Sequence, residues 1–113
     1  ISPGVKISMD ALYQRTAQLP RVELDTPGRY IGKNTVEAMQ SGIVYGIIGQ
    51  ATFLIQKMKE EMDEPDIQVI ATGGLSRLIA PHVPVIDRTD HLLALKGLKA
   101  VYDRNKREEK RKD

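Results

Sequence analysis

The 113-residue sequence contains no cysteine, no tryptophan and only one phenylalanine. The missing cysteines exclude a disulfide scaffold and thiolate metal ligands, and they agree with a reducing cytoplasm. No apolar run approaches the roughly 20 residues that span a bilayer, and no basic, apolar leader opens the chain. We therefore expect a cytoplasmic protein with no membrane partner.

Outside the C-terminal tail, the numbers of acidic and basic residues nearly balance. The net charge is +2, but residues 104–113 hold most of the excess of lysine and arginine, and the rest is close to neutral. Glu108 and Glu109 dilute the tail's charge, and no aromatic residue is interleaved with it. The pattern therefore favours a solvated helix end over a nucleic-acid contact.

Hydrophobic periodicity predicts alternating helices and strands. Helices are expected at residues 5–19, 36–61, 75–79 and 89–104, and strands at 21–24, 67–71 and 83–86. This alternation is typical of an α/β protein with some parallel strand pairing. Because a sheet of so few strands is seldom stable on its own, we expect segments upstream of residue 1 to complete it. The abrupt start at Ile1 likewise suggests a piece of a longer polypeptide.

Two segments combine glycine with polar residues before a predicted helix. In Gly-Lys-Asn-Thr (residues 32–35), Asn34 and Thr35 could bind a small ligand or could simply cap the helix, with Glu37 in its first turn. The segment is not a P-loop, because no serine or threonine directly follows Lys33. In Ala-Thr-Gly-Gly-Leu (residues 71–75), the two glycines could approach a phosphate or could form only a tight turn.

Other candidates are weaker. Ile-Ser-Pro-Gly (residues 1–4) could line a ligand or could begin a helix. Neither His82 nor His91 has a partner at metal-ligand spacing, so no metal site is expected. Asp87 and Asp90 stand at a predicted helix start, where capping is the expected role.

Taken together, four segments resemble type III pantothenate kinases. They are residues 1–12 (ISPGVKISMDAL), residues 31–46 (IGKNTVEAMQSGIVYG), residues 69–75 (VIATGGL) and residues 90–105 (DHLLALKGLKAVYDRN). Their order and spacing agree with the family over nearly the whole chain. Only the tail after Asn105 lies outside the resemblance.

The resemblance implies a fold from the acetate kinase, sugar kinase, Hsp70 and actin superfamily, whose members have two ribonuclease-H-like domains. This chain would supply the second domain at residues 1–105, followed by a charged tail at residues 106–113 that we expect to be disordered. It also implies a homodimer formed through the long helix that begins near Val36 and ends near Glu61. Gly42 and Gly46 would form its close-contact face.

The implied activity is ATP-dependent phosphorylation of pantothenate to 4'-phosphopantothenate, the first step of coenzyme A synthesis. The implied cofactors are ATP, Mg²⁺ and a monovalent cation (K⁺ or NH₄⁺). The implied substrate-binding residues are Thr35, Asn34, Ile1, Pro3 and Gly4, and the implied nucleotide-binding residues are Gly73 and Gly74.

The family's catalytic aspartate maps upstream of Ile1, so no catalytic residue is assigned here and the chain alone is expected to be inactive. The alternative is a non-catalytic regulator with the same fold. Loss of the aspartate from the upstream phosphate loop would favour that alternative.

Overall fold

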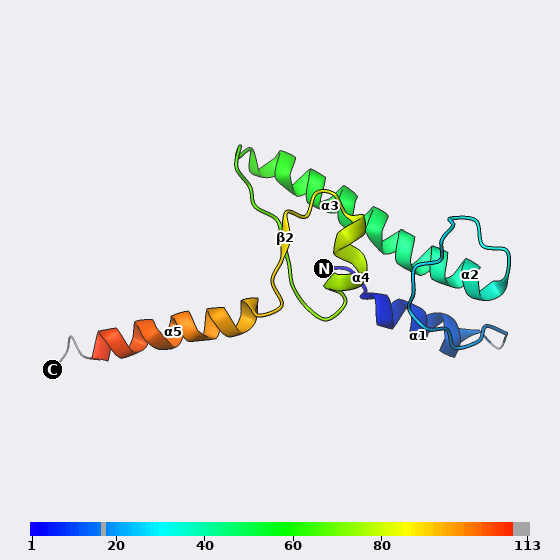
Figure 1. The fold of residues 1–113 in the computed structure, drawn as a ribbon, viewed down its shortest axis with the longest axis horizontal. Coiled ribbons are helices and arrows are strands. Elements are labelled where there is room, and N and C mark those ends of the chain that lie inside the picture. The colour runs from blue at the N-terminus through cyan, green and yellow to red at the C-terminus, as the bar shows by residue number, and fades with distance from the viewer. Residues whose placement is uncertain (17, 110–113) are drawn as a thin grey trace.

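The computed structural model describes residues 1–16 and 18–109. The arrangement is elongated (Figure 1), and its principal-axis extents are 67 × 33 × 21 Å. The elements are α1 (Val5–Arg15), α2 (Thr35–Gln40), the π-helical turn η1 (Ser41–Tyr45), α3 (Gly46–Met62), β1 (Ile70–Ala71), α4 (Ser76–Ile79), the 3₁₀ turn η2 (Ala80–His82), β2 (Arg88–Thr89) and α5 (Leu93–Glu109). The radius of gyration is 19.2 Å, whereas a compact chain of this length would have about 13 Å.

The accessible surface is large for the mass of the chain. It measures 9046 Å² for a 12.6 kDa chain, whereas a compact protein of that mass exposes about 6,200 Å². The excess is about 2,800 Å², whereas obligate interfaces bury roughly 1,000–2,500 Å² on each partner. The chain by itself therefore leaves uncovered surface that is suited to burial against other polypeptide.

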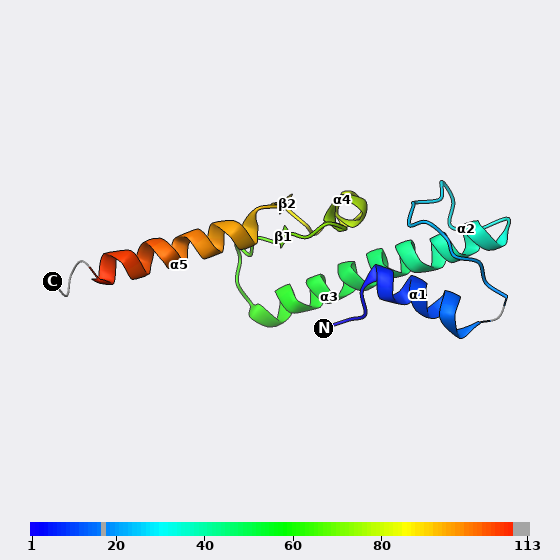
Figure 2. The same cartoon turned by 90° about the horizontal axis from the view of Figure 1, so that it is seen from below.

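The main core lies where α1 packs beside α2 and η1, as Figures 1 and 2 show. Its buried members are Met9, Val22 and Met39, surrounded by Leu12, Leu19, Leu24 and Ile43. The predicted strand at residues 21–24 is wrong, because this segment is irregular and contributes Val22 and Leu24 to the core. The predicted helix over residues 5–19 ends earlier, at Arg15, because Thr16 is already extended.

The long helix runs without a break from Thr35 to Met62, close to the predicted limits. It contains a π-helical turn that periodicity did not predict. By length and composition this helix could cross a membrane, which corrects the expectation that no segment is long and apolar enough. One such helix is weak evidence for a span, since a helix that packs against protein meets the same criterion. Only 11% of its most apolar window is buried within this chain.

The sheet consists of β1 and β2 in parallel, with Ile70 opposite Arg88 and Ala71 opposite Thr89. The α/β class is thus confirmed, although β1 is shorter than the predicted strand. The predicted strand at residues 83–86 is wrong. Those residues form a turn in which the Ile86 N–H donates to the Val83 carbonyl at 3.0 Å. Pro84 fits the second position of such a turn, and the strand forms after it.

The two predicted capping aspartates differ in role. Asp90 accepts a hydrogen bond from the Leu92 N–H at 2.9 Å, just before α5 begins at Leu93. A hydrogen bond from the Lys96 ammonium and the one from Leu92 lower the pKa of Asp90, so its carboxylate stays charged. Asp87 does not cap a helix, because its carboxylate accepts from the Val69 N–H at 2.7 Å and ties β2 to β1.

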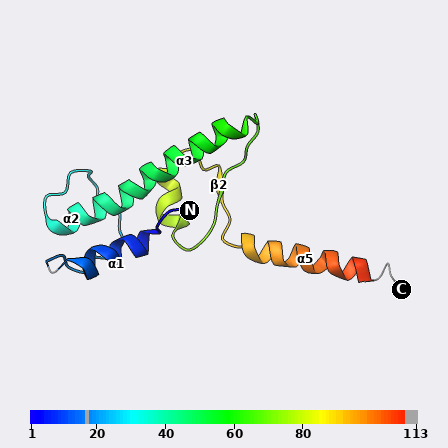
Figure 3. The same cartoon turned by 180° about the vertical axis from the view of Figure 1, so that it is seen from behind.

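Helix α5 extends away from the other elements, as the view from behind in Figure 3 shows. It begins at Leu93, later than predicted, because Thr89 belongs to β2. It continues to Glu109, so residues 106–109 of the expected tail are helical, and residues 110–113 lie outside the described part. Leu95, Leu98 and Tyr102 are each more than 60% exposed, so the described residues leave the apolar face of this helix uncovered.

Candidate functional site

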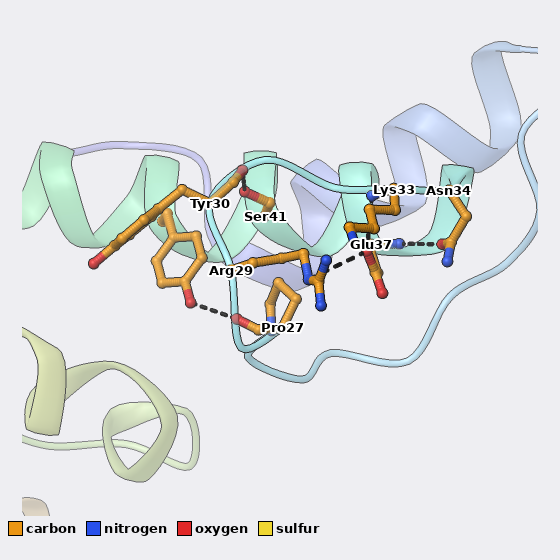
Figure 4. Close-up of polar contacts among 8 residues, drawn as sticks. Pro27, Arg29, Tyr30, Lys33, Asn34, Glu37 and Ser41 are labelled. Atoms are coloured by element: carbon orange, nitrogen blue, oxygen red, sulfur yellow. Dashed lines mark hydrogen bonds and ion pairs between the residues drawn. The ribbon is translucent and has the colours of Figure 1, made fainter.

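The Gly-Lys-Asn-Thr segment forms the N-terminal end of the long helix. The Asn34 side-chain oxygen accepts from the Glu37 N–H at 2.9 Å, and the Glu37 carboxylate accepts from the Lys33 N–H at 2.8 Å (Figure 4). This reciprocal pairing satisfies helix-terminal N–H groups. The side-chain oxygen of Asn34 is therefore engaged in the cap, while Lys33 and Thr35 are exposed.

Gly32 allows the segment to lie directly on the first turn of the helix. A Cβ atom at this position would lie 2.4 Å from the Ala38 nitrogen and 2.7 Å from both the Ala38 Cα and the Glu37 carbonyl carbon. These neighbours are backbone atoms and cannot rotate away. Glycine is thus required here by close approach.

Thr35 lies at the edge of an apolar groove of about 340 Å³. The other lining residues are Leu12, Leu19, Ala38, Met39, Gly42 and Ile43. A threonine hydroxyl beside such a groove suits a small molecule that has both aliphatic and hydrogen-bonding parts. This groove brings together the C-terminal half of α1 and the N-terminal end of the long helix.

The structure does not bring residues 1–4 to this groove. Ile1, Pro3 and Gly4 are exposed, and the Gly4 carbonyl accepts from the Ser8 N–H at 3.0 Å to start α1. Leu12, at the other end of α1, lines the groove. Since the eight residues from Gly4 to Leu12 rise about 12 Å along an α-helix, the two sets of predicted substrate residues lie apart within one chain.

The glycine turn follows β1 as predicted. Gly73 has φ of 97°, a conformation that favours glycine. Its carbonyl accepts from both the N–H and the hydroxyl of Ser76, at 3.2 and 2.7 Å. Apart from the adjacent residues, no atom of the described part of the chain lies within 4 Å of a Cβ placed on Gly73 or Gly74, so this face of the turn is open to a ligand.

Beside the turn lies a second pocket, of about 380 Å³, that sequence reasoning missed. Ser76 and Arg77 line it from α4, and Arg88 and Thr89 line it from β2. Among residues 1–16 and 18–109, neither guanidinium forms an ion pair with a carboxylate. The Arg77 Nε donates to the His91 Nε2 at 3.2 Å. Only the strand register places Arg77 and Arg88 together, so no local signal could have identified the pair.

The described residues contain no group of three His, Cys, Asp or Glu side chains that could hold a metal ion. Nor do they pair a nucleophile with a base. The described residues form two candidate binding sites, an apolar groove next to Thr35 and an arginine-lined pocket beside the glycine turn.

These features define an α/β protein with two candidate ligand-binding loops, one capping a long helix and one following a parallel strand. The sequence model of the type III pantothenate kinase family matches residues 1–57, half of the chain. The chain therefore belongs to the type III pantothenate kinase family.

Two curated relatives agree with this assignment. A type III pantothenate kinase from an Exiguobacterium species is 53% identical over 107 residues, which cover 95% of this chain and 41% of the relative. One from Moorella thermoacetica is 56% identical over 105 residues, covering 93% of this chain and 41% of the relative. The chain thus spans about two fifths of the length of these relatives.

Proposed function

We propose that this chain is part of an enzyme that phosphorylates pantothenate to 4'-phosphopantothenate with ATP. The observation that carries the proposal is identity above one half, over nearly the whole chain, to proteins named type III pantothenate kinase. Phosphoryl transfer depends mainly on positioning and on stabilising charge. The groove beside Thr35 suits pantothenate, and the arginines beside Gly73 suit a nucleotide.

In this proposal the chain supplies the second, ribonuclease-H-like domain at residues 1–105. The open two-stranded sheet and the uncovered faces of α3 and α5 support it, because upstream strands and helices would cover them. The catalytic aspartate and the sites for Mg²⁺ and a monovalent cation would lie on the upstream half, so the chain alone would be inactive. The enzyme would act in the cytoplasm.

We further propose that two copies associate through the long helix. Gly46, Gly49 and Phe53 follow the i, i+3, i+7 spacing of one helix face. Apart from the backbone of the helix itself, no atom of the described residues lies within 4 Å of a Cβ placed on Gly42, Gly46 or Gly49, and Phe53 is 59% exposed. A second copy would cover this face, and it could bring its own Ile1, Pro3 and Gly4 toward Thr35.

The central test is Thr35→Ala in the complete kinase, with the upstream half present. Losing the hydroxyl is expected to raise KM for pantothenate about tenfold, the effect of roughly one hydrogen bond, while KM for ATP stays unchanged. Thr35→Ser keeps the hydroxyl and should restore KM. An unchanged KM in Thr35→Ala would remove Thr35 from the site. If the intact protein phosphorylates no pantothenate at all, the result would favour the alternative, a non-catalytic regulator with the same fold.

The arginine pocket gives a separate prediction for the nucleotide. Arg77→Gln is expected to raise KM for ATP about tenfold or more, because a guanidinium contributes a charge-assisted hydrogen bond to an anion. KM for pantothenate should not change. Arg104→Gln serves as the control, since Arg104 pairs with Glu108 on α5 away from the pocket. Equal ATP kinetics for Arg77→Gln and the control would place the nucleotide elsewhere.

A further inference from the structure

The π-helical turn η1 holds a loop segment, residues 27–31, that we call the strap. The Ser41 hydroxyl donates to the Tyr30 carbonyl at 2.5 Å, and the Tyr45 hydroxyl donates to the Pro27 carbonyl at 2.5 Å. The strap is therefore tied at both ends to one turn of the helix. Figure 4 shows Ser41, Tyr30 and Pro27 on the side of the helix that the strap crosses.

Packing reinforces these two hydrogen bonds. The rings of Tyr30 and Tyr45 lie 4.5 Å apart between centroids, and Ser41 is only 8% exposed. Pro27 is also buried. Both hydrogen bonds are partly buried, so removing either hydroxyl leaves a strap carbonyl that is partly shielded from water and has lost its donor. The strap thus has one preferred position against the helix.

The strap leads directly into the Gly-Lys-Asn-Thr segment. Arg29, within the strap, lies 3.9 Å from the carboxylate of Glu37, and that carboxylate also accepts from the Lys33 N–H. Strap, cap and helix start therefore form one connected network that ends beside Thr35. π-Turns inside α-helices occur frequently at functional sites, and this one carries both hydroxyls that hold the strap.

We propose that Ser41 and Tyr45 are positioning residues for the substrate loop. They fix the strap so that residues 32–35 hold the conformation in which Thr35 meets its ligand. In this proposal they act through the strap, because each hydroxyl already donates its proton to a strap carbonyl. The inference rests on the proposed function of Thr35, but the ordering of the strap can be measured without substrate.

The test uses Ser41→Ala and Tyr45→Phe in the complete kinase. Tyr45→Phe removes only the hydroxyl and leaves the ring beside Tyr30. Each variant is expected to speed hydrogen–deuterium exchange of the amides in residues 29–34 and to raise KM for pantothenate about three- to tenfold. The kcat and KM for ATP should stay within about twofold, since positioning of one substrate is what is lost.

Thr52→Ala is the matched control. The Thr52 hydroxyl donates to the Ile48 carbonyl on the same helix at 2.7 Å but does not contact the strap. This variant should leave both exchange in residues 29–34 and KM for pantothenate unchanged.

Two results would overturn the proposal. Unchanged exchange in residues 29–34 would show that the hydroxyls do not order the strap. Faster exchange with unchanged KM would show that they order it for stability alone. If Thr35→Ala also leaves KM unchanged, the failure lies with the proposed substrate site, and the exchange data still decide whether the hydroxyls order the strap.

Discussion

Replacing Gly32 by alanine is expected to damage both substrate binding and stability. The new Cβ would meet backbone atoms of Ala38 and Glu37 at 2.4 to 2.7 Å, so the loop must move away from the helix. Forcing atoms into such a contact costs about 1–3 kcal/mol or more. For a protein of kinase size we expect Tm to fall by roughly 2–10 °C and KM for pantothenate to rise at least tenfold.

Gly28→Ala is the control for this prediction. Gly28 lies in the same loop, but apart from its chain neighbours no atom among the described residues lies within 4 Å of a Cβ placed there. Its Tm, measured by calorimetry, and its KM for pantothenate should match those of the parent enzyme. Parent-like values for Gly32→Ala would mean that the segment does not lie against the helix as the structure shows.

Placing a charge on the face of α3 that carries Gly46, Gly49 and Phe53 is expected to separate the proposed dimer. Phe53→Glu would bury an unpaired carboxylate in the interface, a change that costs about 3–5 kcal/mol. The dimer dissociation constant should rise at least a hundredfold. Sedimentation analysis of the complete kinase at micromolar concentration should then show a monomer.

Leu98→Glu on α5 tests whether this effect is specific. Leu98 is 68% exposed within the chain, compared with 59% for Phe53. Both changes therefore replace a similarly exposed apolar side chain by a carboxylate. In our proposal the upstream half covers α5, and Leu98→Glu should lower Tm but leave the dimer intact. A dimeric Phe53→Glu protein would place the interface on another surface.

Much of the local structure could be predicted from the sequence. The long helix begins and ends within one residue of its expected limits, the Asn34 cap is in place, and Gly73 has the positive φ that a glycine turn implies. Each of these features depends on residues that are neighbours in the chain. Family membership also followed from the sequence, since it rests on motifs in a fixed order.

The strands could not be placed as well, because a strand needs a partner that propensity cannot supply. Residues 21–24 have a strand-like pattern, yet Val22 and Leu24 pack against helices. Pro84 turns the chain, so the second strand forms at Arg88 and Thr89. In each case a contact with a distant segment decided the outcome.

By itself, then, the sequence determined the helices, the two glycine-containing loops and the family, because local geometry and motif order are written in adjacent residues. Only the tertiary structure placed Arg77, Arg88 and His91 together and tied the strap to Ser41 and Tyr45. It also separated residues 1–4 from Thr35 within one chain. These relations depend on strand register and helix packing, which join residues that are far apart in the chain.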